Sequence, residues 1–274
     1  MMPCLTGFSR SMPCTQKAVG GRNMMMKRLL ASIAVASASL VLPGLALSPA
    51  GAKPSPDCAA DPVPRVNLSG CDLRGLDFSG SDLTRANLSG SNLKGTDLTD
   101  ADLTGANLNH VRSGSIVGDP ASLPSDWIVE QGYLVGPAAN LKNANLREAD
   151  LSASILNKTD FTGADLTDVD FTDSELKSAR FSNTNLTRTI FADSYLQWAQ
   201  FVSSTLTGTD LSGANMTAVK LRGSTFTNVS LAGADFTRIR IVGDVPSSGL
   251  SGSPKHLPSG WSIVGGTLYW LFGG

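Results

Sequence analysis

A large apolar residue recurs at every fifth position from residue 139 to residue 243. This spacing matches neither the period of an α-helix, about 3.6 residues, nor that of a flat strand, about 2 residues. An unbroken repeat of this kind predicts a repeat architecture. The recurring residues, here called the centres, are Leu141, Leu146, Leu151, Leu156, Phe161, Leu166, Phe171, Leu176, Phe181, Leu186, Phe191, Leu196, Phe201, Leu206, Leu211, Met216, Leu221, Phe226, Leu231, Phe236 and Ile241.

A chain that turns one corner in every five residues closes a square coil after four pentads. Such a coil has about 20 residues, and successive coils stack at the β-strand spacing of about 4.8 Å. The centre and the small residue two places before it, such as Ala144 before Leu146, then face inward. The other three residues of each pentad face water. Since no single coil buries its own core, stability is expected to come from the stack.

The pentads carry a recognisable signature. Residues 101–105 read Ala-Asp-Leu-Thr-Gly, residues 106–108 read Ala-Asn-Leu, and residues 164–168 read Ala-Asp-Leu-Thr-Asp. These segments resemble the A(D/N)LXX signature of the pentapeptide-repeat family. The resemblance implies an all-β fold, a right-handed quadrilateral β-helix, over about two thirds of the sequence beyond residue 52. It implies little about function, because members share the coil and not one activity.

The N-terminal segment predicts export. Residues 1–52 contain five basic residues and no acidic one, and an apolar run extends from Leu29 to Leu42. That run is shorter than the roughly 20 residues that a membrane span needs, and residues 50–52 offer an Ala-x-Ala cleavage site. We expect a cleaved signal peptide and a secreted or cell-envelope protein of bacterial origin; the alternative is an uncleaved anchor.

Removal of the leader changes the charge balance. Five of the 22 Lys and Arg residues leave with it, so 17 basic residues remain against 23 acidic ones, a net charge of −6. This value argues against non-specific binding to nucleic acid.

The sequence predicts six segments. The first block of pentads has glycines two places after several centres, which suits corners with positive φ. The expected segments are the signal peptide 1–52, a lead-in or N-terminal cap 53–65, the first pentapeptide block 66–110, a hairpin insert 111–138, the second block 139–243 and a C-terminal hairpin cap 244–274.

Two cysteines remain after removal of the leader. Cys71 is an inward residue of the first coil, and Cys58 lies in the Pro-rich lead-in. In an oxidising compartment a disulfide between them is expected to fasten the lead-in over the open end of the stack. The alternative is one buried and one exposed free thiol.

Two similar segments interrupt or follow the pentads. Residues 116–119 match residues 241–244, and Leu-Pro-Ser-Asp-Trp at 123–127 matches Leu-Pro-Ser-Gly-Trp at 257–261. Each is followed by a predicted strand, turn and strand. The first hairpin is a cap between two stacks or a loop from one continuous stack, and we favour the loop. Trp127 and Trp261 are predicted to anchor the hairpins; the alternative is an exposed ring that stacks on a sugar.

Pentads 20 residues apart share a face, so the second block can be sorted by face. A basic face and an opposite acidic face are predicted as interaction surfaces, with Phe161, Phe181 and Phe201 behind the first and Phe171 and Phe191 behind the second. The alternative is a chance distribution of charge on a solvated surface. A third face shows Ile155, Tyr195 and Trp198. The basic face contains Lys142, Arg180, Lys220, Arg222 and Arg240 against Asp160, and the acidic face contains Asp150, Asp170, Asp173, Asp193 and Asp210.

No catalytic, metal-binding or cofactor-binding residues are predicted. His110 and His256 are far apart in sequence and have no Cys/His, Ser/His/Asp or metal-ligand spacing around them. The predicted function is a non-catalytic exported scaffold, a monomer or weak homo-oligomer, that binds an unknown protein or envelope component and neither nucleic acid nor a small-molecule substrate.

The resemblance also implies an alternative function. Some pentapeptide-repeat proteins imitate duplex DNA in shape and charge, bind DNA gyrase and protect it from quinolones. This sequence departs from that pattern in its export signal, in its basic face and in a C-terminal segment that predicts strands where those proteins have a dimerising helix. A duplex mimic needs acidic docking surfaces.

Overall fold

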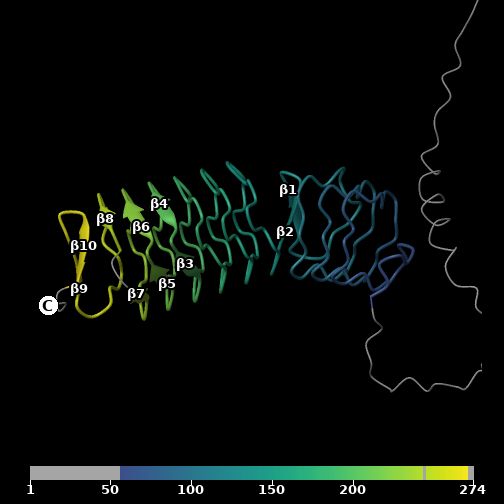
Figure 1. Cartoon of the computed structure of the whole chain (residues 1–274). Coiled ribbons are helices and arrows are strands. Elements are labelled where there is room, and N and C mark those ends of the chain that lie inside the picture. Colours follow the sequence, from purple (N-terminus) through teal and green to yellow (C-terminus); the bar gives the residue numbers. More distant parts are fainter. Residues whose placement is uncertain (1–55, 243–244, 271–274) are drawn as a thin grey trace, which may run out of the picture. The chain divides into compact units, whose positions relative to one another are not determined.

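The computed structural model describes residues 56–242 and 245–270. The predicted signal peptide lies outside the described residues. Residues Lys53–Gly274 form one compact unit. Its described part is a right-handed quadrilateral β-helix, as the period of five predicted, and it contains strands and turns but no helix (Figure 1).

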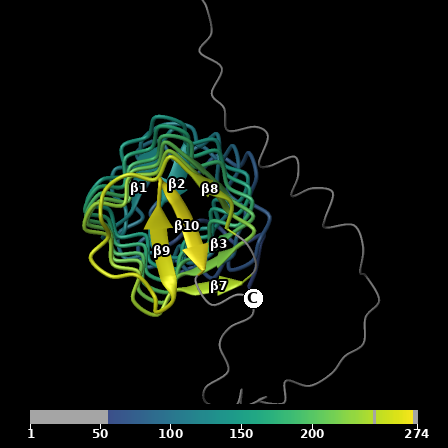
Figure 2. The ribbon, with the colours of Figure 1, turned by 90° about the vertical axis from the view of Figure 1, so that its left-hand side faces the viewer.

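Each coil pairs with the coil 20 residues further along the chain. Asp160 pairs in parallel with Arg180, for example, and the amide of Phe161 donates to the carbonyl of Arg180 at 2.8 Å. Viewed along its axis, the stack has four sides (Figure 2). We name the sides by their paired residues: face A has 155, 175, 195, 215 and 235; face B has 140, 160, 180, 200, 220 and 240; face C has 145, 165, 185, 205 and 225; face D has 150, 170, 190, 210 and 230.

Within residues 56–242 and 245–270, the coils form extended strands on two faces. Most coils pair through a single residue per face, and longer strands form toward the C-terminal end of the stack. On face B they are β3 (Gln200–Val202), β5 (Lys220–Arg222) and β7 (Arg240–Val242). On face C they are β4 (Thr205–Thr207), β6 (Thr225–Thr227) and β8 (Ser247–Ser248). Two antiparallel hairpins complete the described strands: β1 (Ile128–Glu130) with β2 (Tyr133–Val135), and β9 (Trp261–Val264) with β10 (Thr267–Trp270).

The core consists of columns of centres. Phe161, Phe181 and Phe201 stack behind face B with ring centroids 5.2 and 4.8 Å apart. Phe171 and Phe191 stack behind face D with centroids 5.1 Å apart. Both columns were predicted from the sequence. Rings in adjacent columns meet edge to face, the arrangement that aromatic quadrupoles favour.

Buried hydroxyls bind the coils to one another. Several inward positions hold Ser or Thr where an alanine would also fit, and their side chains are buried. The Oγ1 of Thr184 donates to the carbonyl of Phe161 at 3.0 Å, and that of Thr209 donates to Leu186 at 2.7 Å. Each bond crosses to the neighbouring coil, so these polar atoms are buried without loss of a hydrogen-bond partner.

The corners combine positive φ with side-chain caps. The residue two places after a centre has positive φ at most corners, whether or not it is glycine. The aspartate or asparagine one place before a centre accepts a bond from the backbone two residues on. The amide of Thr172, for instance, donates to Asp170 at 2.8 Å. This local turn explains the frequent acidic residues of the pentads.

The predicted disulfide is confirmed. Cys58 is bonded to Cys71, whose side chain is buried in the first coil. The amide of Asp57 donates to the carbonyl of Asn67 at 3.2 Å, so the lead-in is held on the stack by backbone as well as by sulfur.

The predicted segment boundaries at 110/111 and 243/244 are wrong, because the coils continue beyond both. In the first case Arg112, Val117 and Ser122 pair in parallel with residues 20 positions earlier. In the second case Ser251 pairs with Ser230 and His256 with Asp235. Backbone pairing requires inward side chains of suitable size, such as Val111, and not the full sequence signature. The hairpins therefore begin only after Ser122 and His256.

The first hairpin is a layer inside the stack. On one side the amide of Ile116 donates to the carbonyl of Gly132 at 3.0 Å. On the other side the amide of Asn145 donates to the hydroxyl of Tyr133 at 3.2 Å. Trp127, Leu134 and Val135 belong to the same apolar core as the coils. The favoured projecting loop is therefore wrong, since β1 and β2 lie between coils (Figure 1), while face B continues past them through the Arg112–Asn140 pair.

The second hairpin docks on its coil in the same way. The amide of Leu250 donates to the carbonyl of Gly266 at 2.9 Å, as that of Ile116 donates to Gly132. The amide of Leu268 donates to Ser247 Oγ at 2.9 Å, and that of Leu134 donates to Ser113 Oγ at 2.9 Å.

This docking corrects the sequence match of residues 116–119 with 241–244. Their structural counterpart is 250–253, because Ile116 and Leu250 make the equivalent bond to the hairpin turn. Gly243 and Asp244 lie outside the described residues. The match was misleading because 117 pairs on face C, whereas 241 lies in β7 on face B. The second hairpin consequently follows face A, one face further around the stack than the first, which follows face D.

Candidate functional site

The described residues contain no cluster of three or more His, Cys, Asp or Glu side chains that could hold a metal ion. Within the same residues, no helix has the length and apolar character needed to cross a bilayer. His256 lies beside a carboxylate, with its Nδ1 3.2 Å from Asp235 Oδ1, and His110 lies at a corner next to face B. The charged residues predicted as interaction surfaces lie on the faces and corners of the solenoid.

The acidic residues of face D are occupied by their own turns. Asp150, Asp170 and Asp210 accept hydrogen bonds from the hydroxyls two residues on, at 2.6, 2.6 and 2.5 Å. The Ser152 hydroxyl holds the pKa of Asp150 below its usual value. Ile190 separates Asp170 from Asp210 on this face. The other two predicted members, Asp173 and Asp193, have positive φ and lie at the corner beyond the face.

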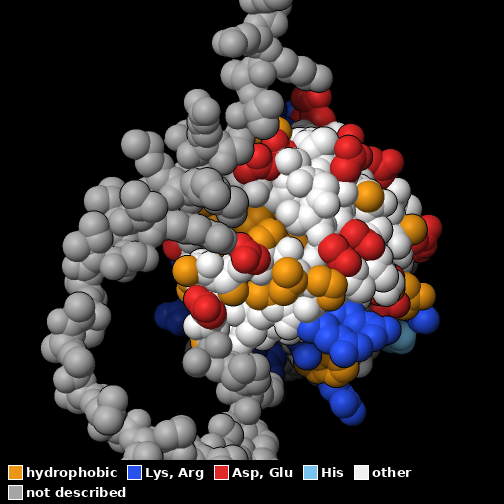
Figure 3. Space-filling model, turned by 90° about the vertical axis from the view of Figure 1, so that its right-hand side faces the viewer, with side chains coloured by type: hydrophobic (Ala, Val, Ile, Leu, Met, Phe, Trp, Pro, Cys, Tyr) orange, Lys and Arg blue, Asp and Glu red, His pale blue; other side chains and the backbone are white. Residues whose placement is uncertain are grey.

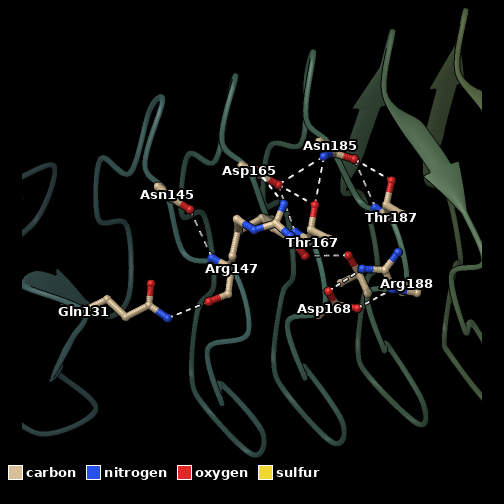
Figure 4. A network of polar contacts seen from close by, with 11 residues as sticks. Gln131, Asn145, Arg147, Asp165, Thr167, Asp168, Asn185, Thr187 and Arg188 are labelled. Carbon is tan, nitrogen blue, oxygen red and sulfur yellow. Dashed lines mark hydrogen bonds and ion pairs between the residues drawn. The ribbon is translucent and has the colours of Figure 1, made fainter.

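The charged residues of face C and its corner pair with one another (Figure 4). Arg188 makes a two-pronged contact with Asp168 of the preceding coil, Nε to Oδ1 at 2.6 Å and Nη2 to Oδ2 at 2.5 Å. Arg147 Nη1 lies 3.2 Å from Asp165 Oδ2. The hydrogen bond from Arg188 lowers the pKa of Asp168. These cations therefore join coils and are not available to a partner as free charges.

Face B is divided along the stack. Around Asp160, the carboxylate lies 3.4 Å from Lys142 Nζ and 3.7 Å from Arg180 Nη1. Burial raises the pKa of Asp160, but the hydrogen bonds from Thr162 and the charge of Lys142 outweigh it, so the pKa lies below its usual value. Two of the five predicted basic residues thus share a single carboxylate.

The remaining three predicted cations form no ion pair with a described acid. Lys220, Arg222 and Arg240 are exposed on β5 and β7, and none forms an ion pair with any acid of residues 56–242 or 245–270. Arg238, at the corner before β7, is also exposed and forms no ion pair with an acid of the described residues. Lys220 and Arg240 are direct partners in the parallel register, so two like charges lie side by side.

A shallow groove runs beside these cations, along the corner between faces A and B. One section has a volume of about 500 Å³, and the next section, of about 330 Å³, shares Ser178 and Gln200 with it. His110 lines the end of the second section, and each coil after it contributes one corner residue and one face B residue. The corner residues are Lys158, Ser178, Trp198, Ala218 and Arg238, and the face residues are Asp160, Arg180, Gln200, Lys220 and Arg240.

Trp198 is the feature of this groove that the sequence interpretation misplaced. It was grouped with Ile155 and Tyr195, but it lines the groove next to the cations. Its side chain is 58% exposed and its φ is 60°. A bulky residue is uncommon in this backbone region, and nothing in the coil requires an indole there. The spacing of 20 from Ser178 and Ala218, and of 40 from Arg238, would have placed it correctly.

The other two members of that predicted apolar patch have separate surroundings. Ile155 is half-buried and lies beside Asp126 and Ile128 of the first hairpin segment. Tyr195 is exposed on face A, with Lys177 Nζ 5.5 Å from its ring centre. The three residues therefore do not form one patch.

Charge of the two signs is unevenly distributed on the visible surface at the N-terminal end. Blue Lys and Arg side chains gather on the lower right of that view, while red Asp and Glu side chains are spread over the rest (Figure 3).

Comparison with known proteins supports the repeat. The family description "Pentapeptide repeats" matches in eight copies, at residues 65–100, 81–112, 138–173, 170–208 and 204–241, which together span more than half of the chain. No curated protein matches the chain.

Several solved structures are similar. A pentapeptide-repeat protein, Rfr23, from the cyanobacterium Cyanothece 51142 is 21% identical with a TM-score of 0.37, over 42% of this chain and 88% of that one. HetL, a protein involved in heterocyst differentiation regulation in Nostoc sp. strain PCC 7120, is 22% identical with a TM-score of 0.26, over 68% and 89%. Full-length QnrB1, a plasmid-mediated fluoroquinolone resistance protein, is 17% identical with a TM-score of 0.22, over 70% and 91%.

Proposed function

The chain belongs to the pentapeptide-repeat family, and from that premise we propose that it is an exported, non-catalytic scaffold that binds an anionic partner through face B. One observation carries the proposal. The cations of face C pair with acids of adjacent coils, whereas Lys220, Arg222 and Arg240 have no acidic partner in the described part of the chain.

The arrangement of these cations has a cost in the free protein. Like charges directly opposite one another on neighbouring strands are destabilising, and Lys220 and Arg240 are such a pair. Face C shows that the same backbone accommodates alternating charges. An anionic partner would offset the repulsion on face B. Binding therefore explains the cation cluster, which the stability of the free protein does not.

Export is part of the proposal and rests on the sequence. The apolar run from Leu29 to Leu42 with the Ala-x-Ala site at 50–52 supports a signal peptide, and the proposed location is the cell envelope or the exterior. The mature chain would then carry the net charge of −6.

Charge reversal tests the proposed surface. We would replace Lys220, Arg222 and Arg240 together by Glu and use the protein to capture partners from envelope extracts. The matched control replaces Arg65, Lys94 and Lys255 by Glu. These three residues are also exposed, and their replacement changes the net charge by the same amount. Loss of the captured material with the first variant and retention with the control is expected. Equal capture by both variants would refute the assignment to face B.

Cell fractionation tests the location and separates the alternative. An exported pool of mature size is expected. A pool confined to the cytosol, together with protection of purified DNA gyrase from a quinolone, would favour duplex mimicry and overturn the proposal.

A further inference from the structure

We propose that the groove between faces A and B binds an acidic polysaccharide, one that carries a carboxylate or sulfate at regular intervals. This inference rests on the proposed function and specifies the partner's chemistry. The ligand would lie along the stack axis, with its sugar rings against the corner residues and its acidic groups against face B.

The repeat supplies a periodic row of contact points. Because paired coils stack at about 4.8 Å, each coil presents its corner residue and its face residue at that interval. In the section of about 500 Å³, Lys220, Arg238 and Arg240 come from two successive coils. A linear polymer laid along the groove could therefore meet Lys220 in one coil and Arg238 and Arg240 in the next, with its following units against Gln200 and Ser178.

The guanidinium groups suit carboxylate and sulfate. Arg238 and Arg240 lie at the same end of the groove and carry planar forks that can bind two oxygens at once. Neither forms an ion pair with an acid among the described residues, so no internal bond has to be broken for binding.

Trp198 supplies an apolar ring next to the cations. Its indole is largely exposed at the corner of its coil, and it lines the same section of the groove as Lys220 and Arg240. The flat face of an indole can cover the C–H face of a sugar ring, while the hydroxyl and acidic groups of the sugar contact polar residues of the groove.

Neutral polar residues complete the lining. Ser178 and Gln200 lie between the cationic section and the section around Asp160. A hydroxyl and a carboxamide both donate and accept hydrogen bonds, as sugar hydroxyls require. The section beyond them has Lys158 and Arg180 with Asp160, whereas the section with Trp198 has three cations and no acid, so the positive charge is stronger at the Trp198 end.

The lining favours a polysaccharide over single-stranded nucleic acid. Non-specific sites for single strands stack successive bases on several aromatic side chains. Trp198 is the one Trp, Tyr or Phe among the residues that line both sections. His110 adds an imidazole only to the section around Asp160, so one indole beside hydrogen-bonding residues matches one stacked sugar within a longer chain.

Binding of hexagalacturonate by isothermal calorimetry tests the proposal, with neutral maltohexaose and a 12-residue oligothymidylate as comparison ligands. The wild-type protein should bind hexagalacturonate, with affinity that falls as salt is raised because the contacts are ionic. Replacement of Lys220, Arg238 and Arg240 by Ala should reduce affinity at least tenfold, and Trp198→Ala about threefold to tenfold, equivalent to about 0.7–1.4 kcal/mol.

Matched controls keep a folding defect from being mistaken for loss of binding. Tyr195→Ala removes an exposed ring from face A of the same coil, and Lys255→Ala removes an exposed cation from another part of the chain. Both should bind as the wild type does. The control variants and Trp198→Ala should keep the wild-type thermal midpoint because the replaced side chains are exposed, and the Lys220, Arg238 and Arg240 variant should unfold at or above it because the Lys220–Arg240 repulsion is removed.

Three outcomes would overturn the proposal. They are no binding of hexagalacturonate at about 1 mM, affinity unchanged in the groove variants, and tighter binding of oligothymidylate that depends on Trp198. In each case the capture experiment with the charge-reversed face B still decides the broader function. If that variant loses the captured partner and the wild type does not bind hexagalacturonate, the scaffold function stands and the polysaccharide ligand is rejected.

Discussion

The two hairpins use one docking geometry in two different settings. In both, a serine hydroxyl of the coil accepts a bond from the second strand, and the turn glycine accepts a bond from the coil. Their outer surfaces differ. Val135 of the first hairpin is 1% exposed beneath the next coil, while Tyr269 and Val264 of the second are 49% and 61% exposed.

The difference shows that docking and covering are separate properties. The bonds of Ser113 and Ser247 fix each hairpin to the coil that precedes it. Burial of the far side depends only on what is stacked there: the coil from residue 140 onward covers the first hairpin, and no described residue covers that side of the second. The same element can thus be a spacer in the stack or a lid on it.

The largest difference between the hairpins is expected on removal of their indoles. Trp127→Ala should lower the free energy of unfolding by about 3–5 kcal/mol, because the side chain is 9% exposed and fills a core site against Gly136. Trp261→Ala should cost less, since Trp261 is only half-buried. Urea denaturation measures both. Equal losses would contradict the distinction between spacer and lid.

The disulfide extends the comparison to the opposite end of the stack. Replacement of Cys58 and Cys71 by Ser should cost about 3 kcal/mol in the chain-entropy account of a short closed loop. Thermal unfolding of the variant, with and without reductant, measures the effect. Reductant should lower the midpoint of the wild type but not that of the variant, and an identical midpoint for both proteins without reductant would show that the bridge is dispensable.

Removal of the docking serines should affect both hairpins equally. Ser113→Ala and Ser247→Ala each leave one strand amide without its acceptor, and each should cost about 0.5–1.5 kcal/mol. Denaturation midpoints of the two single variants provide the measurement. A large loss of unfolding free energy for one variant and none for the other would mean that the two equivalent hydrogen bonds do not contribute equally to stability.

The smallest effect concerns acid stability at the junctions that lead into the hairpins. Ser122 hydrogen-bonds Asp102, and this bond, with one from Thr104, lowers the pKa of Asp102 to about 2. The unfolded pKa is about 3.9, so the stabilisation is complete above that pH and is lost as pH falls toward 2. These two pKa values set a window of about pH 4 to 2, and within it Asp102→Asn should reduce the fall in the free energy of unfolding.

At the equivalent junction of the second hairpin, Thr237 and then His256 lower the pKa of Asp235, so the sign is the same. Urea titrations at several pH values would compare the two junctions. An Asp102→Asn protein with the full acid sensitivity of the wild type would contradict the assignment.

The period of five was sufficient to predict the columns of the core. Phe161 and Phe181 stack because residues 20 apart occupy the same place in successive coils, and that follows from spacing alone. The disulfide was predictable for a similar reason, since Cys71 occupies an inward position.

Other features depend on backbone pairing that the signature does not encode. Residues 112, 117 and 122 continue the coil without it, so the first hairpin could not be placed between coils from the letters of the pentads. The groove was missed because corner positions were treated as turns, although Trp198 and Arg238 project from two of them.

A stack in which each coil contacts only its neighbours loses structure most readily from an end, where one neighbour is missing. The Cys58–Cys71 bridge closes that route at the first coil, because the strand that would peel away is covalently tied to it. Fraying is therefore directional: it starts at the second hairpin and travels back toward the bridge, and face B beside Arg240 lies on the side that opens first.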